Sequence, residues 1–480
     1  MVNRKLLIGF VIITIVILYT FVYDLSYFKE VRDFYELTQT NVSFKYILVW
    51  TSLKTDPLFN LRVARDAFIE RACPITNCFV TGNRELLHDI TKFDVIVFHA
   101  PEFVQKGVQS LPAQRKPHQK YIFTSMESAA YYPICNQKFL NFFNWTWTYK
   151  LNSDLNYAYF SVWNKNGSVI GPKEEMHWMK VEDMAPVNDT LKEILNGKTI
   201  AAAWFVSNCG APSGRDKIAK QLQIELQTHG LRLDIYGSCG TMKCPKSSMD
   251  ECMLKLRSDY YFYLSFENSF SDDYVTEKLL NALDNYAVPV VFGGANYTRF
   301  MPDGIYLSAN TLTIKELAKK MADSIKNKEL YYEYFKWHNH YSYRDVVASV
   351  ETDPYCKLCE AINNEEEMSK TTIYEDIGMW FMPDGTYLSA NTLTIKELAK
   401  KMADIIKNKE LYYEYFKWHN HYSYRDVVAS VETDPYCKLC EAINNEEEMS
   451  KTTIYEDIGM WWSPKKCQFK NNRFLNKHLA

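Results

Sequence analysis

Five residues that can bind an anion or exchange a proton lie within one twelve-residue part of the stretch DYYFYLSFENSFSDDYVTEKLLNALDNYAVPVVFGGANYTRF, which spans residues 259–300. They are Glu267, Asn268, Tyr274, Glu277 and Lys278. A lysine in the first turn of a helix adds a full positive charge where the free N–H groups and the dipole already favour an anion. This pattern predicts an anion site. The alternative is a solvated lysine paired with Glu277 or Asp273.

The elements around these residues form one predicted βαβ unit. Residues 260–266 are apolar and aromatic, which predicts a buried strand, and a helix is expected to begin near Thr276 because Leu279, Leu280, Ala282 and Leu283 share one face. Residues 287–294, AVPVVFGG, predict a second buried strand. Ligands of such units bind beyond the carboxyl ends of the strands.

A second strand-to-helix turn upstream also carries a cation. The segment FVSNCGAPSGRDK, residues 205–217, predicts a strand, a glycine-containing loop and a helix that begins near Arg215. Two such turns favour a diphosphate site between them, although an ordinary turn with a surface arginine is the alternative for this one alone. No D-x-D triplet occurs in the chain, so we expect Lys278, Arg215 and helix N-termini, rather than a tightly held metal, to neutralise the phosphates.

The first half of the body predicts another doubly wound α/β lobe. Strands are expected in KYILVWT, CFVTG, FDVIVFHA and KYIFTSM, with helices in LFNLRVARDAFIERA and NRELLHDIT between them. Glu127 follows the strand KYIFTSM at the end where ligands gather. Its carboxylate can act as a general base on a hydroxyl, or it is a helix-start glutamate favoured by the dipole.

The N-terminus predicts a membrane anchor. Arg4 and Lys5 precede an apolar run over residues 6–23 that is long enough to span a bilayer, and no cleavage site of the A-x-A kind follows. The charge distribution places the body in the lumen of the secretory pathway. Twelve cysteines and five glycosylation sequons agree with that compartment. The sequons are at Asn41, Asn144, Asn166, Asn188 and Asn296.

The chain then repeats itself. Residues 300–380 and 381–461 match at all positions except Ile305 against Thr386 and Ser324 against Ile405. Such identity indicates a recent tandem duplication or an artefact of gene prediction, not a solenoid. By chain continuity we expect the first copy to complete the second lobe.

Each copy contains a C-x-x-C pair. The cysteines are Cys356 and Cys359 in the first copy and Cys437 and Cys440 in the second. We expect a local structural disulfide in preference to zinc or a redox centre, because no clear strand precedes the pair and the second pair only copies the first.

Net charge is −3 and no long basic run occurs, which argues against a nucleic-acid partner.

On these motifs the chain resembles the α1,3-fucosyltransferases of the Golgi, the GT10 family, nematode members included. FENSFSDDYVTEKLLNAL and AVPVVFGGANYTRFMP are similar to the donor-binding signature of that family, and SNCGAPSGRDK, MESA and FNWTWTYKLNSDL (residues 143–155) are similar to its other motifs in the same order. The resemblance covers roughly residues 45–360. The family has no counterpart of the duplicated segment.

The resemblance implies a GT-B-like fold of two Rossmann-like lobes with parallel sheets, preceded by a single transmembrane helix. It implies that Arg215 and Lys278 hold the diphosphate of GDP-fucose, that Glu267, Asn268, Tyr274 and Glu277 contact its ribose or fucose, and that Glu127 is the base. It further implies an inverting transfer to a GlcNAc hydroxyl of a glycoprotein or glycolipid glycan. No cofactor is expected to be tightly bound, and a divalent cation is expected at most to stimulate the transfer without being required. An inactive glycan-binding protein on the same fold is the alternative.

The expected organisation is a cytosolic tail (1–5), a type II anchor in the Golgi membrane (6–23), a stem (24–44), an acceptor-side lobe (45–185), a GDP-fucose-binding lobe (186–380), the second copy (381–461) and a C-terminal tail (462–480).

Overall fold

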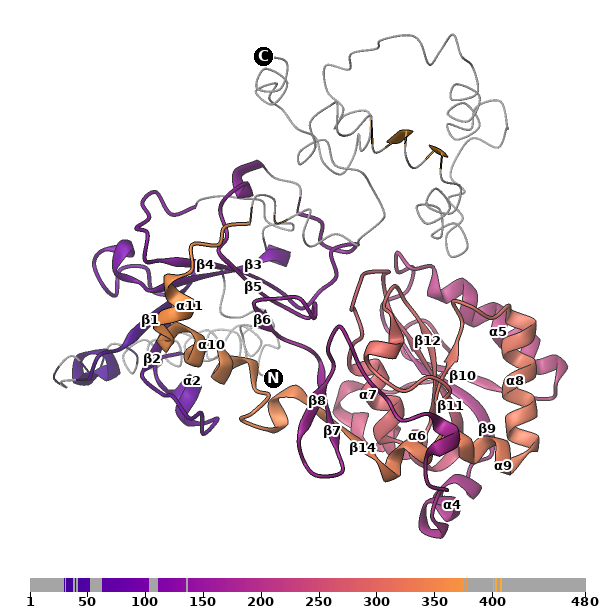
Figure 1. Cartoon of the computed structure of the whole chain (residues 1–480). Helices are drawn as coiled ribbons and strands as arrows, with labels where there is room; N and C mark the ends of the chain where they lie inside the picture. The colour runs from indigo at the N-terminus through magenta and orange to yellow at the C-terminus, as the bar shows by residue number, and fades with distance from the viewer. Residues whose placement is uncertain are drawn as a thin grey trace, which may run out of the picture. The chain divides into compact units, whose positions relative to one another are not determined.

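The computed structural model describes residues 42–51, 63–102, 111–134 and 137–374, together with residues 30, 32–37, 39, 377, 400, 402–403 and 406–407. The chain divides into two compact units (Figure 1). The first contains the described parts of 1–127, 141–174 and 343–375, and the second those of 128–140, 175–342 and 376–480.

The first unit is built on a parallel sheet in the order β2-β1-β3-β4-β5-β6. Its strands are β1 (Lys45–Val49), β2 (Cys78–Thr81), β3 (Val95–His99), β4 (Lys120–Ser125), β5 (Trp145–Thr148) and β6 (Leu155–Asn156), and its helices are α2 (Asp66–Ile69), α10 (Pro354–Asn363) and α11 (Glu365–Ser369). Apolar residues of β1 to β5 pack with α2 and α10 in one core. The parallel strands predicted for this half are confirmed.

The helix predicted in residues 83–91 is wrong. This segment forms turns that end in a short 3₁₀ helix at Ile90–Lys92. The side chain of Asn83 accepts a hydrogen bond from the backbone N–H of Glu85, and His88 has a φ of 57°, which a continuing helix does not allow. Local side-chain bonds therefore outweigh the apolar spacing here.

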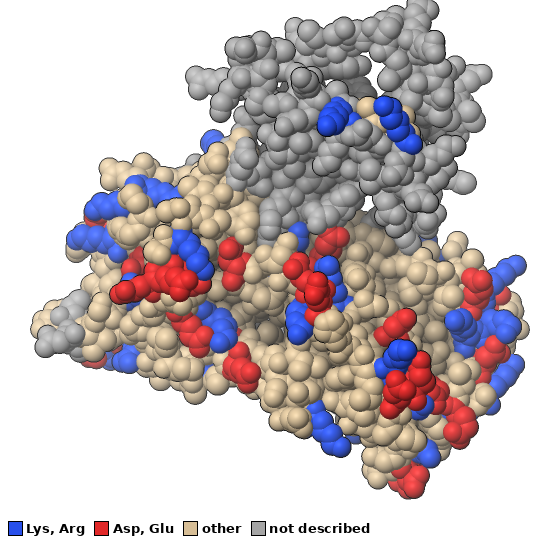
Figure 2. Space-filling view, in the orientation of Figure 1, with Lys and Arg blue, Asp and Glu red and all other residues tan. Residues whose placement is uncertain are grey.

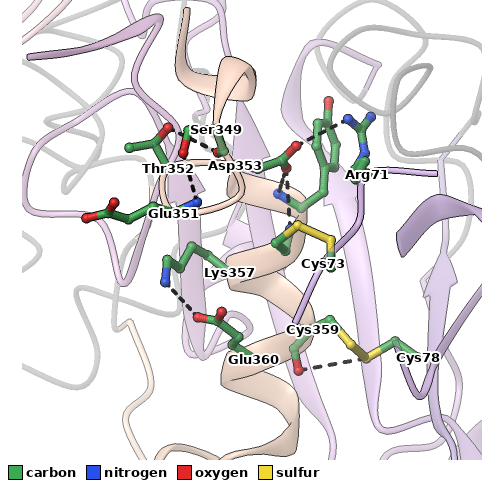
Figure 3. Close-up of a disulfide and its surroundings, with 12 residues drawn as sticks. Arg71, Cys73, Cys78, Ser349, Glu351, Thr352, Asp353, Lys357, Cys359 and Glu360 are labelled. Atoms are coloured by element: carbon green, nitrogen blue, oxygen red, sulfur yellow. Dashed lines mark hydrogen bonds and ion pairs between the residues drawn. A yellow bond between two sulfur atoms is a disulfide. The ribbon is translucent and has the colours of Figure 1, made fainter. Parts of the chain in front are cut away.

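Helix α10 is fastened to the first unit by two disulfides, Cys73–Cys356 and Cys78–Cys359 (Figure 3). The predicted local disulfide between Cys356 and Cys359 is therefore wrong. Residues three apart in a helix share a face, so both sulfurs face the α2–β2 region instead of each other. An ion pair between Arg71 and Asp353, 3.3 Å long, lies beside the first disulfide.

The second unit contains a parallel sheet in the order β10-β9-β11-β12-β13. Its strands are β9 (Ile200–Phe205), β10 (Leu233–Tyr236), β11 (Tyr260–Phe266), β12 (Val288–Phe292) and β13 (Leu307–Ser308), and its helices are α4 (Asp189–Asn196), α5 (Arg215–Thr228), α6 (Met249–Asp259), α7 (Glu277–Asp284), α8 (Ile314–Lys326) and α9 (Lys328–Glu333).

Helices cover both faces of this second sheet (Figure 1). Apolar residues of α5, α8 and α9 pack on one face, against Trp204, Phe262 and Leu264 among others. On the other face α6 and α7 contribute Leu256 and Ala282 to a smaller cluster. Alternate residues of β9 and β11 thus point to opposite, buried faces, as the continuous apolar runs in the sequence require.

A small sheet, β14-β7-β8, joins the strands β7 (Phe160–Asn164), β8 (Val169–Gly171) and β14 (Tyr341–Asp345). Further 3₁₀ turns occur at Gln137–Phe139, Val181–Asp183, Lys246–Ser248, Tyr297–Arg299, Lys336–Asn339 and Val346–Ala348.

The first repeat copy contributes to both units. Its residues up to 342 supply β13, α8 and α9 to the second unit, and residues 343–375, with α10 and α11, belong to the first. This differs from the predicted boundary, which assigns all of 186–380 to one lobe. Nearly all of the second copy lies outside the described residues.

No helix within the described part of the chain is long and apolar enough to cross a membrane. The anchor expected at 6–23 lies outside that part.

Candidate functional site

The two cation-bearing turns occur at the point where the order of the second sheet reverses. The chain starts at β9, moves outward to β10, and then returns to the other side of β9 with β11. Open α/β sheets bind ligands outside the carboxyl ends of the strands at such a switch point. The loop after β9 leads to Arg215, and the loop after β11 leads to Lys278.

The turn after β11 is organised by Glu267. This side chain is only 1 % exposed, and its Oε1 accepts hydrogen bonds from the backbone N–H of Thr276 at 2.9 Å and from the Thr276 hydroxyl at 3.0 Å. Thr276 is the N-cap residue of α7. Glu267 thus accepts a hydrogen bond from a backbone N–H at the start of α7. In most helices the side chain of the N-cap residue provides such an acceptor.

Lys278 lies among acceptors at the same helix start. Its Nζ is 3.2 Å from Glu267 Oε2 and 3.2 Å from Glu277 Oε1, and it donates to the Thr276 hydroxyl at 2.7 Å. Burial favours the neutral amine, but the two carboxylates outweigh it and raise the pKa of Lys278 above its ordinary value. The lysine therefore stays charged, with an 18 % exposed side chain. Of the two partners expected for a solvated lysine, Glu277 is therefore found next to Lys278. The other, Asp273, pairs with Arg299 at 2.9 Å.

Arg215 is held differently. One of its terminal nitrogens donates to the carbonyl of Phe266 at 2.8 Å, and the other donates to the carbonyl of Asn208 at 3.1 Å. The residue is 3 % exposed, and its Nε has no hydrogen-bond partner among the described atoms. Burial lowers the pKa of Arg215, while Glu267 acts in the opposite direction. Arg215 therefore brings a positive charge to this edge and also ties the loop after β9 to the end of β11.

Ser213 provides a second connection between the two turns. Its hydroxyl donates to the carbonyl of Glu267 at 2.8 Å, and its backbone N–H donates to the carbonyl of Asn268 at 3.0 Å. From the sequence, Ser213 is not singled out, and Thr276 is named only as the expected start of a helix. A serine two residues before a helix and a threonine at its N-cap are common, and only the fold shows that they bind across the switch point.

The other residues predicted to contact the sugar nucleotide differ in exposure. Glu277 has a 57 % exposed side chain, and Asn268 is half-buried with its Oδ1 accepting from the Ser269 hydroxyl. Tyr274 is 2 % exposed and thus part of the packed turn. The structure brings Arg215, Glu267 and Lys278 together and leaves Glu277 at the surface.

Glu127 belongs to the first unit. It follows β4, is half-buried, and its carbonyl accepts a hydrogen bond from the Ser125 hydroxyl at 2.7 Å. The preceding carbonyl, that of Met126, accepts from the Tyr159 hydroxyl at 2.5 Å. Two side chains therefore fix the backbone that carries this carboxylate.

The described residues contain one group with metal-ligand geometry, Cys209, Asp216 and Cys239. Its two cysteines are bonded to each other as a disulfide, so their sulfurs are not thiolate ligands.

The sequons differ in accessibility. Asn166, Asn188 and Asn296 are exposed, whereas Asn144 is 6 % exposed and its side-chain N–H donates to the carbonyl of Thr372 at 3.0 Å. The folded chain thus presents three of the five predicted acceptors, and Asn41 lies outside the described residues.

Charge is mixed on one face of the described surface. On the face shown in Figure 2, basic and acidic side chains are interspersed, without a large patch of one sign.

Comparisons with known proteins identify both halves of the chain. Residues 43–160 match the family model "Fucosyltransferase, N-terminal", and residues 195–380 and again 379–461 match "Glycosyltransferase family 10 (fucosyltransferase) C-term". The chain is 36 % identical to alpha-(1,3)-fucosyltransferase C of Drosophila melanogaster over 71 % of its own length and 78 % of the relative's. It is 29 % identical to the human 4-galactosyl-N-acetylglucosaminide 3-alpha-L-fucosyltransferase FUT6, over 71 % and 83 % of the two chains.

Nematode members are not singled out by these comparisons. Alpha-(1,3)-fucosyltransferase fut-6 of Caenorhabditis elegans is 26 % identical, over 70 % of this chain and 80 % of that one. Among solved structures, an α1,3-fucosyltransferase with GDP-fucose aligns with a TM-score of 0.41 at 15 % identity, over 70 % of this chain and 95 % of that one.

Proposed function

Because the chain belongs to glycosyltransferase family 10, the fucosyltransferases, we propose that it transfers L-fucose from GDP-β-L-fucose to a GlcNAc hydroxyl of a glycoprotein or glycolipid glycan in α1,3 linkage. The observation that carries this proposal is the charged Lys278 at the first turn of α7, next to Arg215 at the switch point of the second sheet. A nucleotide diphosphate has the charge and size for such an edge.

Binding of the donor is assigned to the second unit. Lys278 and Arg215 neutralise the diphosphate, and the departing GDP needs this positive charge more than it needs a proton. The exposed Glu277 accepts hydrogen bonds from ribose or fucose hydroxyls, with Asn268 and Tyr274 completing the contact. Glu267, with both oxygens engaged by Thr276 and Lys278, acts by holding the lysine in place. No metal is required.

Glu127 is the general base in this proposal. Its carboxylate takes the proton from the acceptor hydroxyl as that oxygen forms a bond to the anomeric carbon, and the bond from that carbon to the β-phosphate oxygen of GDP breaks. Attack opposite the leaving group inverts the anomeric configuration through an oxocarbenium-like transition state. The hydrogen bonds from Ser125 and Tyr159 orient the backbone at Glu127.

The proposed setting is the Golgi lumen, with the chain anchored by residues 6–23. The disulfides of the structure require an oxidising compartment and agree with this setting.

A transfer assay with radiolabelled GDP-fucose tests the proposal. The acceptor panel contains N-glycans that differ at the core and at the antennae, and glycolipid glycans. The assay compares the full chain with a variant that lacks residues 381–461. Transfer by either form supports the enzyme. Glycan binding without transfer by both forms would establish the alternative, an inactive glycan-binding protein, and transfer only after the deletion would show that the second copy blocks activity.

The variant Glu127→Gln tests the role of the base. We expect transfer to fall by about 10²–10⁴-fold, the usual contribution of a general base, while GDP binding measured by calorimetry stays unchanged because Glu127 is not part of the donor site. Ser125→Ala is the matched control, since it loosens the same turn but keeps the carboxylate. Turnover retained by Glu127→Gln would exclude Glu127 as the base.

A further inference from the structure

The loop after β9 is attached to its surroundings by a disulfide that the proposed reaction does not use. Cys209, in this loop, is bonded to Cys239, in the loop after the neighbouring strand β10. Both loops leave the sheet at the carboxyl ends of adjacent parallel strands. The disulfide therefore lies on the same edge as the proposed donor site, on the side of β10.

Cys209 occupies a particular place within its loop. The residue before it, Asn208, provides the carbonyl that accepts a hydrogen bond from Arg215, and the residue after it, Gly210, donates its N–H to the Asp216 carboxylate at 3.0 Å. Residues 207–210 are otherwise exposed. Residues 208–210, whose Asn208 carbonyl accepts from the Arg215 guanidinium, are thus held by these two hydrogen bonds and by the disulfide. No packed core of the described residues covers them.

The partner loop is folded tightly against the ends of β9 and β10. Gly237 has a φ of 96°, and a Cβ on it would lie 2.3 Å from the carbonyl oxygen of Val206. A Cβ on Gly240 would lie 1.9 Å from the carbonyl oxygen of Ile235. Only glycine fits at both positions, so Cys239 is presented from a fixed backbone and provides an anchor for Cys209.

We propose that the Cys209–Cys239 disulfide is a positioning element for the donor: it holds the Asn208 carbonyl against Arg215 and so pre-orients the guanidinium for the diphosphate. Without it the loop keeps its attachments through Ser213 and Asp216 but loses the fixed end next to Asn208. The donor must then order this segment on binding, and affinity falls. This inference rests on the proposed function, because it assumes that the donor binds at this edge.

The test compares two double variants of the full chain produced in a eukaryotic secretory host. Cys209→Ser with Cys239→Ser removes the proposed positioning bond, and Cys244→Ser with Cys252→Ser removes another disulfide of the same unit, one that connects the segment before α6 to α6. We expect the first variant to raise the Kd for GDP and the KM for GDP-fucose by about fivefold to tenfold, the cost of immobilising one or two side chains, with kcat and the acceptor KM unchanged. The second variant should keep the wild-type donor constants.

Partial reduction of the wild-type chain gives the same information if the first variant does not fold. Cys209 is exposed, whereas the four cysteines of the α10 disulfides are buried, so a mild phosphine should open Cys209–Cys239 before those two disulfides. Alkylation with mass spectrometry identifies which bonds are open. A wild-type Kd for GDP after its loss, or an equal rise in both variants, would overturn the inference. A wild-type chain that neither binds GDP nor transfers fucose would instead overturn the proposed function.

Discussion

Two lysines whose side chains are mostly shielded from solvent lie at opposite ends of the same strand, β11, and their surroundings give them opposite properties. Lys278 is at the carboxyl end, where Glu267 and Glu277 keep it charged. Lys198 is at the amino end, 2 % exposed, and its Nζ donates to the carbonyls of Arg257 at 2.7 Å and Tyr260 at 2.9 Å. Burial lowers the pKa of Lys198 to about 7, with Asp259 acting against it.

This difference distinguishes the lysine proposed to bind the donor from a lysine with a structural role. Carbonyl dipoles satisfy the hydrogen bonds of an ammonium group but do not replace the solvation that a full charge loses on burial, whereas carboxylates do much more to offset it. Lys278 can therefore present a charge to a ligand at neutral pH. The ammonium group of Lys198, which precedes β9, instead lies at the C-terminal end of α6 and donates to a carbonyl that the helix leaves free.

The largest effect is expected for Lys278→Met. Removing the ammonium leaves Glu267 buried without its cationic partner, which typically costs about 3–5 kcal/mol of unfolding free energy. GDP affinity should fall by about 100-fold or more, because a charge-assisted contact to phosphate is lost. Calorimetry and denaturant unfolding measure the two effects.

A second variant separates these two effects of Lys278→Met. Lys278→Met combined with Glu267→Gln should regain stability, because the unpaired charge is gone, but not GDP affinity. Recovery of GDP binding in this double variant would contradict the assignment of Lys278 to the diphosphate.

Lys198→Met should show the opposite pattern. Its loss removes a donor from backbone carbonyls at the end of α6 and the start of β11, at a cost of about 1–3 kcal/mol. GDP affinity should not change, since Lys198 lies at the other end of the strand. A weaker Kd for GDP in this variant, measured under conditions where it remains folded, would break the proposed distinction between the two lysines.

A smaller effect is expected for Arg215→Lys. Lysine keeps the charge but cannot fork onto the carbonyls of Phe266 and Asn208 together. We expect the KM for GDP-fucose to rise about tenfold, which corresponds to about 1.4 kcal/mol, with the acceptor KM unchanged. Lys217→Arg, on the first turn of the same helix, is the matched control, and an equal change in both variants would show that Arg215 has no special part in donor binding.

The main buried strands of both units and their parallel sheets could be predicted from the sequence, because short, β-prone apolar runs such as residues 260–266 favour strands that are covered on both faces. The order of the strands within each sheet could not. The starts of α5 and α7 could also be predicted, since the loops before them are polar and the helix faces are apolar. Arg215 and Lys278 therefore lie in the first turns of two helices, as predicted.

Contacts between segments distant in sequence could not be predicted. Cys73 and Cys78 are more than 280 residues from their disulfide partners, and no local pattern encodes that pairing. The same holds for Glu267, whose sequence position suggests a ligand contact but whose carboxylate is used by Thr276 and Lys278. Its role depends on how tightly the turn after β11 folds back onto α7, which is a property of packing and not of residue type.

The smallest effect is a pH dependence that distinguishes the two lysines without any ligand. The pKa of Lys198 is lower in the folded chain than in the unfolded one, so the unfolded chain binds more protons above pH 7, and stability rises with pH. With a folded pKa of about 7, the gain between pH 7 and 8 is about 1 kcal/mol. Lys278 contributes no slope there, because its raised pKa keeps it protonated in both states. Denaturant unfolding at the two pH values should therefore show the gain in wild type, and Lys198→Met should lack it. A gain of the same size in Lys198→Met would show that another group titrates in this range and that Lys198 is charged in the folded chain.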